Sequence, residues 1–333
     1  MERQGGRQDR AGQGGLQGQR HPGDRVIDFR AWRKAELHCH LDGAVRPATA
    51  EELATEQGLD LPRPLRLVAP PDCPSQAAYV AYFEPMIAVL QTEAALERAA
   101  HELGADSAAE GIDYLEVRWA PLLHRRRGLS VQRVIEAVLR GLHSAPLRAV
   151  AIACGLRQHD PEDNLALARQ AGVYAGRGLV GFDLAGDEAR FPARSHRRAF
   201  EAARAAGLHL TCHAGEAGEP SNVIEALELG VERVAHGVIG ARDPTVVERV
   251  RREGVVLDLC PTANWKCKAV PRLEDHPLPG LVRQGVRCTI STDSRTVAGT
   301  TLTRELQLAA GMGLSEEELR ECLDTAYEAR FDR

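Results

Sequence analysis

The feature that most constrains the fold is a series of apolar runs of strand length that alternate with segments of helical spacing. The runs are continuously apolar, which is typical of parallel strands covered on both faces. There are eight of them: 35–38, 114–119, 149–154, 179–184, 208–212, 231–235, 255–259 and 286–290. Helical spacing is clearest in 131–142, 164–171, 195–206, 221–229 and 244–252. Eight such units in about 300 residues predict an α/β fold, the (β/α)8 TIM barrel, with a doubly wound open sheet as the alternative.

The interval between the first two runs, residues 41–113, is much too long for a single crossover. We expect it to hold extra helices that cover the barrel mouth, because insertions after the first strand commonly close a site from water there. Residues 1–25 are rich in Gly, Gln and Arg with almost no apolar side chain, which predicts a disordered tail. No internal repeat or low-complexity linker divides the rest, so we expect a single domain over 26–333.

Composition narrows the class of partner. A net charge of −5 provides no positive field for phosphate backbones or anionic lipid, so we expect neither nucleic acid nor a membrane as partner. No apolar run approaches the ~20 residues of a membrane span, and the amino terminus lacks the apolar centre of a signal peptide. The 8 cysteines are scattered without a CxxC pair, as expected for reduced packing residues. These features favour a cytoplasmic protein with a small-molecule ligand and no obligate protein partner.

Side chains that suit a metal ion occur at the ends of three predicted strands. Residues at the carboxyl ends of barrel strands face the mouth. His38 and His40 are one residue apart in extended chain, so they project to the same side and can reach one cation. His213 follows the fifth strand, and Asp293 follows the eighth. Three imidazoles and one carboxylate predict a mononuclear site, most simply one zinc ion per chain, with a position left for water.

Each of these four residues has an ordinary explanation when taken alone, such as a buried core histidine or an aspartate that caps a helix. Their shared position at strand ends is what favours metal ligation. A lysine-bridged pair of metals is excluded, because residues 35–265 contain no lysine. A zinc site of the cytidine deaminase type is excluded as well, because the chain lacks its HxE and PCxxC motifs.

Two further polar residues at the predicted mouth suit proton handling. A metal ion of this kind lowers the pKa of a bound water toward about 7, which supports hydrolytic attack on an electrophilic carbon. Glu216 lies three residues after His213, where it can protonate a substrate nitrogen or shuttle a proton. His236 ends the sixth strand, where it can orient the attacking water and stabilise charge at the tetrahedral centre. The sequence therefore predicts a metal-dependent hydrolase with Glu216 and His236 as its catalytic residues.

These residues lie in motifs that resemble those of the adenosine deaminase family within the amidohydrolase superfamily. The motifs follow the family's order over nearly the whole chain after residue 25: KAELHCHLDGA at 34–44, YLEVR at 114–118, DLAGDE at 183–188, HAGE at 213–216, AHG at 235–237, CPT at 260–262 and TD at 292–293. The resemblance implies a zinc (β/α)8 barrel that hydrolyses the 6-amino group of a purine nucleoside. It agrees with the four metal ligands, and implies that Glu216 protonates ring nitrogen N1 and that His236 orients the attacking water.

The resemblance also implies substrate contacts. Asp42 is implied to bind the ribose 5′-hydroxyl, and the Gly186 amide to bind ring nitrogen N3, where glycine permits the close approach of a flat base. Ser294 departs from the pattern, because familiar members carry there a second aspartate that hydrogen-bonds N7. A serine hydroxyl can donate to a neutral N7 but is shorter than aspartate. The stretch 295–305 resembles a bacterial adenosine deaminase branch in which that aspartate is also replaced.

We therefore expect deamination of adenosine and 2′-deoxyadenosine to inosine and 2′-deoxyinosine, within purine nucleoside metabolism. Other 6-aminopurine nucleosides, such as aminodeoxyfutalosine or a natural-product intermediate, remain alternatives. Adenine fits less well because it has no ribose for Asp42. A nucleotide fits less well because the only cationic candidates near Asp42 for its phosphate are Arg46 and the arginine run 125–127, and that run is expected on a solvated loop. A family member that binds nucleosides without catalysis is disfavoured, because no metal ligand or catalytic residue is missing.

The lid segment 77–83 is less bulky than expected over a purine, which fits either ordinary helix packing or an altered pocket.

Overall fold

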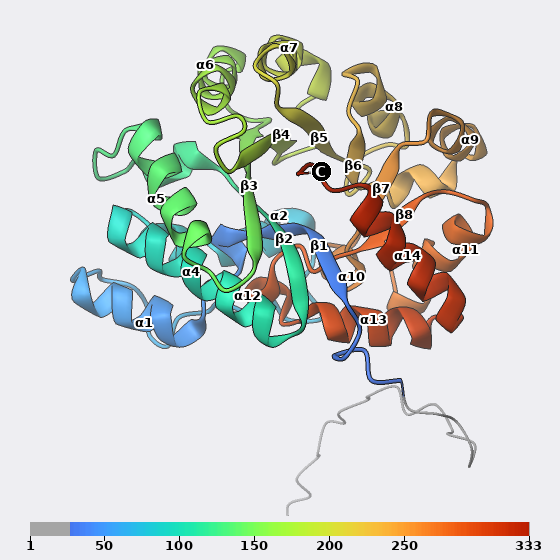
Figure 1. Ribbon diagram of the computed structural model, residues 1–333, viewed down its shortest axis with the longest axis horizontal. Helices are drawn as coiled ribbons and strands as arrows, with labels where there is room; N and C mark the ends of the chain where they lie inside the picture. The colour runs from blue at the N-terminus through green and yellow to red at the C-terminus, as the bar shows by residue number, and fades with distance from the viewer. Residues whose placement is uncertain (1–26, 333) are drawn as a thin grey trace, which may run out of the picture.

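The computed structural model describes residues 27–332, so the predicted tail over 1–25 lies outside the described residues. Eight parallel strands lie side by side in chain order. Their bounds are β1 (Lys34–His40), β2 (Ile112–Trp119), β3 (Arg148–Leu156), β4 (Leu179–Ala185), β5 (His209–Ala214), β6 (Arg233–His236), β7 (Val256–Leu259) and β8 (Cys288–Ile290). Each predicted apolar run overlaps one of these strands, and the strands circle a common axis (Figure 1).

The sheet closes on itself between β1 and the chain that follows β8. Cys39 pairs in parallel with Asp293. The His40 N–H donates to the Asp293 carbonyl at 2.6 Å, and the Asp293 N–H donates to the His38 carbonyl at 3.0 Å. Closure confirms the (β/α)8 barrel, and the open-sheet alternative is wrong. The same bonds bring the predicted metal ligands of the first and last strands side by side.

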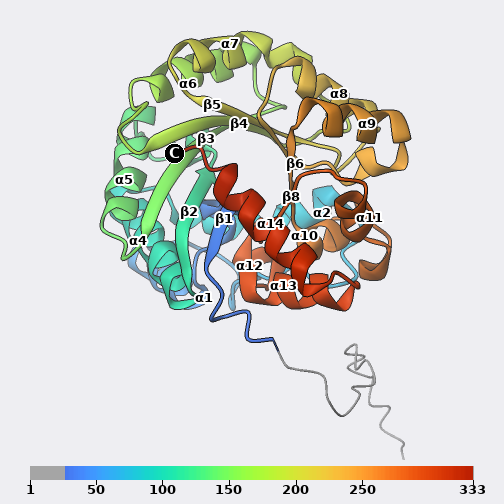
Figure 2. The same ribbon diagram turned by 45° about the vertical axis from the view of Figure 1, so that its right-hand side comes forward.

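The connecting helices form a ring outside the strands (Figures 1 and 2). Helix α5 (Val131–His143) illustrates why they form there. Ser130 caps its first turn by accepting the Arg133 N–H at 3.2 Å, and one face buries Val131, Val134, Ile135, Val138 and Leu142. The outer helices are α4 (Glu93–Ala109), α5, α6 (Pro161–Gly172), α7 (Arg197–Ala205), α8 (Ser221–Glu228), α9 (Pro244–Glu253), α11 (Leu278–Arg283) and α13 (Leu302–Gly311), and the last helix of the chain is α14 (Glu316–Glu328).

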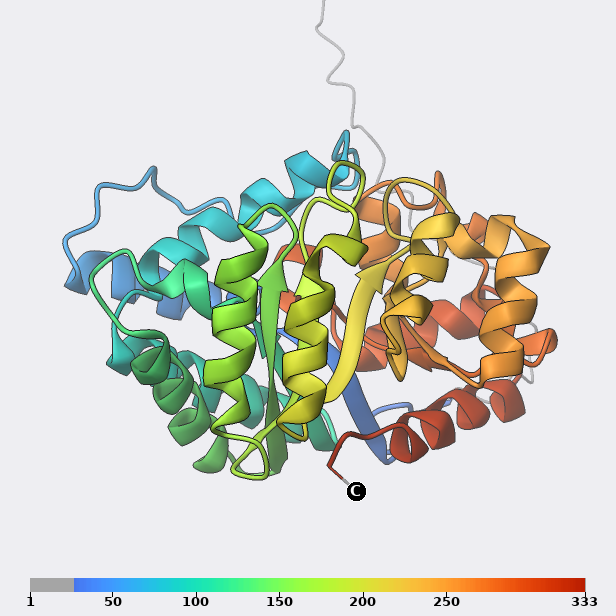
Figure 3. The ribbon, with the colours of Figure 1, turned by 90° about the horizontal axis from the view of Figure 1, so that it is seen from above.

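The long interval after β1 holds three helices ahead of the crossover helix α4, as expected. They are α1 (Pro47–Glu56), α2 (Gln76–Val80) and α3 (Glu84–Val89). Figure 3 shows this insertion at the end of the barrel toward which the strand arrows point, with α14 at the opposite end. Two short helices, α10 (Pro261–Lys266) and α12 (Arg295–Ala298), follow β7 and β8. The insertion therefore lies over the end of the barrel where the strands end.

Paired charges fill much of the barrel interior. Arg118 donates to Asp183 at 3.0 Å, Arg233 bonds Glu116, and Glu36 accepts from an arginine that follows β8. All of these side chains are buried. Losing one member of such a pair costs about 3–5 kcal/mol, because its partner stays buried and unpaired. The charged side chains beneath the strand ends are therefore held in place by their partners.

Two expectations from composition concern the whole chain. The eight cysteines are all buried and none forms a disulfide, as expected for packing residues. Within residues 27–332, every helix is too short or too polar to cross a membrane.

Candidate active site

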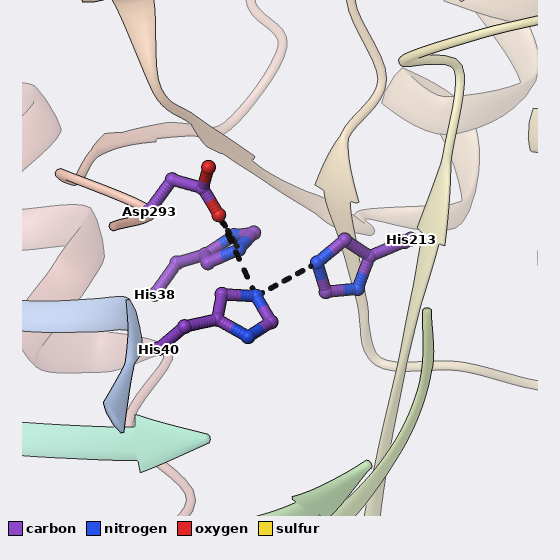
Figure 4. Close-up of side chains that lie close together, drawn as sticks. All are labelled: His38, His40, His213 and Asp293. Atoms are coloured by element: carbon purple, nitrogen blue, oxygen red, sulfur yellow. Dashed lines mark hydrogen bonds and ion pairs between the residues drawn. The ribbon is translucent and has the colours of Figure 1, made fainter. Parts of the chain in front are cut away.

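Four side chains from opposite parts of the barrel converge at the mouth (Figure 4). His38 and His40 come from β1, His213 from β5, and Asp293 from the turn after β8. One ligand atom of each lies within 4.8 Å of the others. Nε2 of His40 is 3.1 Å from Nε2 of His213, and Asp293 Oδ1 is 3.3 Å from Nε2 of His38. All four residues that the sequence nominated as ligands are thus brought together.

The hydrogen bonding of this cluster fits a cation at its centre. Among the described residues, neither ring nitrogen of His38 has a hydrogen-bond partner, although both are buried. Such a group costs free energy unless something else satisfies it. Nδ1 of His213 lies 3.0 Å from a carboxylate oxygen of Asp183, so its proton is held there and the lone pair of Nε2 faces the cluster. Imidazole nitrogens and one carboxylate oxygen suit a divalent ion such as zinc.

Two of the mouth residues have an unusual backbone. Asp293 has a φ of 62° and His236 a φ of 73°, both in the left-handed region that side chains other than glycine rarely adopt. The turn at Asp293 is held by its neighbour Thr292, whose N–H and hydroxyl both donate to Glu36. Strain of this kind persists only where the surroundings impose it, and it is common at functional sites.

A chain of hydrogen bonds determines the tautomer of His236. The Cys260 N–H donates to Oδ1 of Asn264 at 3.2 Å, so the amide nitrogen of Asn264 faces the other way. That nitrogen lies 3.0 Å from Nδ1 of His236 and donates to it. Burial lowers the pKa of His236 to about 4, so the ring is neutral. Its single proton is therefore on Nε2, which faces Glu216 Oε1 at 3.6 Å.

His276 completes this chain behind Asn264. Its Nδ1 accepts the Leu278 N–H at 3.2 Å, which places its proton on Nε2. Nε2 lies 3.2 Å from Oδ1 of Asn264 and donates to it. The orientation of His236 is thus set by groups well behind the mouth.

Glu216 lies on the cavity wall with both carboxylate oxygens in contact. Gln76 of the lid helix α2 donates to Oε2 at 2.6 Å, and the Cys267 thiol donates to Oε1 at 3.2 Å. Burial, reinforced by the charge of Asp293, raises the pKa of Glu216 above its usual range. The loop that carries it is held by Glu188, which accepts the N–H groups of residues 215–217. The arrangement suits a carboxylic acid that donates a proton.

A cavity of about 400 Å³ lies between the strand ends and the lid. Asp42 lines it, accepts the Ala120 N–H at 3.3 Å and lies 3.5 Å from Nε2 of His124. Burial alone would raise the pKa of Asp42, but the imidazoles of His124 and His40 hold it below its usual range. Gly186 also lines the cavity, with a φ of 100°. The remaining predicted residues on its wall are His40, His213, Glu216, His236 and Asp293.

Ser294 occupies a different place from the one expected for a substrate contact. Its side chain is fully buried and is absent from the cavity wall. The hydroxyl donates to Oδ2 of Asp293 at 2.9 Å. A Cβ built at Gly43 would lie 2.5 Å from Cβ of Ser294, so Ser294 packs against the turn after β1. The hydroxyl supports the carboxylate of Asp293 from behind.

The sequence analysis assigned no role to several residues of the site, although Tyr79 lies in the lid segment 77–83 that it identified. Gln76 and Tyr79 reach the cavity from the insertion, far along the chain from any strand end. Asn264 and His276 act from behind the wall. Arg126 also lines the cavity, although its run was expected on a solvated loop, and its guanidinium donates to Glu84 at 2.9 Å. Only the CPT motif, close to Asn264, pointed to this part of the chain.

Comparison with known proteins places this geometry in a family. A family model described as adenosine deaminase matches residues 33–332. The adenosine deaminase of Shewanella halifaxensis is 38% identical over 310 residues, covering 90% of this chain and 94% of the relative. That of Vibrio vulnificus strain YJ016 is 41% identical over 288 residues, covering 82% and 86%. The crystal structure of an adenine deaminase from Arthrobacter aurescens superposes with a TM-score of 0.81 at 27% identity, covering 90% and 94%. The chain belongs to the adenosine deaminase family of hydrolases.

Proposed function

We propose that this protein hydrolyses adenosine and 2′-deoxyadenosine at the 6-amino group, forming inosine or 2′-deoxyinosine and ammonia. The observation that carries the proposal is the convergence of His38, His40, His213 and Asp293 beside Glu216 on the wall of one cavity. The proposal includes a small-molecule substrate, a cytoplasmic location and action without nucleic acid or an obligate protein partner, which rest on the sequence.

The four converging residues would hold one zinc ion. Nitrogens of three imidazoles and one carboxylate oxygen are ligands that suit zinc, and Nε2 of His38, which lies beside Asp293 and has no hydrogen-bond partner among the described residues, would be one of them. When bound, a divalent ion polarises water and lowers its pKa, which makes water a nucleophile near neutral pH. Asp183 would keep His213 in the tautomer that binds metal.

Glu216 and His236 would handle the protons and charges of the reaction. Glu216, whose pKa is raised by burial, donates a proton to ring nitrogen N1 and so makes carbon C6 more electrophilic. His236 presents Nε2–H toward the same space, so it donates a hydrogen bond to the attacking oxygen and cannot act as its base in this tautomer. The two residues therefore have distinct roles: one transfers a proton and the other orients an oxygen.

Asp42 and Gly186 would bind the nucleoside. The ionised carboxylate of Asp42 accepts a hydrogen bond from the ribose 5′-hydroxyl, and the Gly186 N–H donates to ring nitrogen N3. Asp42 favours a nucleoside over the free base that the name of the Arthrobacter enzyme implies. It also disfavours a 5′-phosphate, because like charges repel and Arg126, the arginine on the cavity wall, is already paired with Glu84.

A panel of substrates tests the proposal. We would follow loss of the 6-amino chromophore on protein of measured metal content, with adenosine, 2′-deoxyadenosine, aminodeoxyfutalosine, adenine and AMP. The proposal expects the two nucleosides to be turned over with kcat/KM of about 10⁴ M⁻¹ s⁻¹ or more, the lower end of the usual range for enzymes. If aminodeoxyfutalosine alone were turned over, the proposed deamination reaction would stand, and aminodeoxyfutalosine would replace adenosine as the substrate. Turnover of adenine or AMP in preference to nucleosides would contradict the role of Asp42.

A further inference from the structure

The cavity wall beside Asp293 presents a hydroxyl group from the lid. Tyr79 belongs to helix α2, lines the cavity and is only 2% exposed. Its hydroxyl lies 3.4 Å from Oδ2 of Asp293 and 3.3 Å from Oγ of Ser294. Its ring meets the ring of Phe83 edge-on at 6.1 Å, which restricts where the hydroxyl can point. Tyr79 is therefore a positioned polar group next to the proposed reaction centre.

The proton of this hydroxyl is not committed to a strong bond. Oδ2 of Asp293 already accepts the Ser294 hydroxyl at 2.9 Å, whereas both contacts of Tyr79 are longer than the usual 2.5–3.0 Å of an O–H···O bond. A neutral phenol has one proton to donate. Tyr79 can therefore turn its proton toward a ligand without leaving Asp293 unsatisfied.

Two side chains of helix α2 contact the carboxylates of Glu216 and Asp293. Gln76 donates to Glu216, and Tyr79, three residues later, lies beside Asp293. Side chains three apart on a helix are neighbours, with Cβ atoms about 5–6 Å apart. In a purine, carbon C6 lies between ring nitrogen N1 and the edge that carries N7. If N1 faces Glu216, then N7 is the acceptor on the other side of C6, toward Asp293 and Tyr79.

We propose that the Tyr79 hydroxyl donates a hydrogen bond to ring nitrogen N7 of the substrate, so that the lid helix helps to select the base. The inference rests on the proposed function and deepens it. Ser294 does not make this contact, because its hydroxyl is buried behind Asp293 and away from the cavity wall. Recognition of N7 thus depends on the lid being in place over the mouth.

A pair of ligands that differ only at N7 tests this contact. Inosine and 7-deazainosine are the same except that the second carries C–H in place of N7, and neither has a 6-amino group to lose. Their inhibition constants would be measured against adenosine turnover, and their dissociation constants by calorimetry on the metal-loaded protein. We expect wild-type protein to prefer inosine by about tenfold, which is typical of one buried hydrogen bond.

Substitution of Tyr79 by Phe removes the hydroxyl and keeps the ring. In Y79F we expect affinity for inosine to fall about tenfold and affinity for 7-deazainosine to stay, so that the preference disappears. Tyr82 lies on the same lid segment but is absent from the cavity wall, so Y82F is the matched control and should keep the preference. S294A should also keep it, whatever its effect on turnover.

The possible outcomes separate the inference from the proposed function. Wild-type protein without any preference, or Y79F with the preference intact, would overturn the inference while adenosine turnover still supported the function. Loss of the preference in S294A but not in Y79F would assign the contact to Ser294 and overturn the inference. A wild-type protein that binds neither ligand and deaminates no purine nucleoside would overturn both proposals. Metal content and thermal unfolding of each variant confirm that a folded, loaded protein is being compared.

Discussion

The side-chain amide of Asn264 donates to Nδ1 of His236 at 3.0 Å and so decides which ring nitrogen of His236 carries the proton. The direction of this bond is not arbitrary, because the Cys260 N–H occupies the oxygen of the same amide. His236 is left with Nε2–H toward the cavity. A neutral imidazole in this tautomer can orient and stabilise an oxygen but cannot remove its proton.

Reversing this bond should inactivate the enzyme without removing its metal. In N264D the carboxylate prefers to accept from Nδ1–H, which moves the proton of His236 and turns its cavity-facing nitrogen into an acceptor. We expect kcat to fall about 10²–10³-fold, the usual cost of losing one hydrogen-bond donor that stabilises an oxygen in the transition state. Imidazole ¹⁵N chemical shifts would report the tautomer directly. Wild-type kcat in a variant whose tautomer has changed would contradict the role given to His236.

Metal affinity should depend on Asp183 even though it is not among the four proposed ligands. Asp183 holds the Nδ1 proton of His213 at 3.0 Å, so D183N should weaken metal binding about 10–100-fold, as measured by competition with a chelator. Asp258 provides the matched control, because it is an equally buried carboxylate that contacts Arg118 and Arg233 but no proposed ligand. Equal losses of metal affinity in D183N and D258N would mean that metal affinity depends on buried negative charge in general and not on the contact between Asp183 and His213.

His276 should make the folded state sensitive to acid. Burial lowers its pKa to about 3, against about 6.5 in the unfolded chain. Between these values the unfolded state binds a proton that the folded state does not, so stability is complete above pH 6.5 and is lost as pH falls toward 3. Replacing His276 by Gln should reduce the slope of unfolding free energy against pH in this window, by up to about 1.4 kcal/mol per pH unit. Denaturant unfolding at several pH values measures it, and an unchanged slope would refute it.

The barrel itself could be predicted because its signals are local. Each strand is an apolar run flanked by breaks, and the pairing order follows the chain. The proposed ligands were found for the same reason, since His38, His40, His213 and Asp293 all lie at strand ends, where barrel geometry forces residues together.

The rest of the site depends on contacts between distant segments. The sequence identified 77–83 as a lid segment but gave no role to Tyr79 or Gln76, whose helix has five residues and reaches the cavity because the insertion folds over the mouth. The position of Ser294 follows from the left-handed backbone of Asp293. Residues other than glycine rarely adopt this conformation, so it could not be predicted from the residue type. Asn264 and His276 form a hydrogen-bond chain whose direction depends on backbone donors at two other positions.

The most direct test of the account compares wild-type protein with E216Q for conversion of adenosine to inosine and ammonia, at equal and measured metal content. Gln is nearly isosteric and keeps one acceptor oxygen, but its NH2 cannot accept the second hydrogen bond that Glu216 accepts, and it has no acidic proton to transfer. The account predicts that wild-type protein deaminates adenosine and that E216Q retains its metal and fold while kcat falls by about 10²–10⁴-fold or more. An E216Q variant that turned over adenosine at close to the wild-type rate, or a metal-replete wild-type protein that left adenosine unchanged, would contradict it.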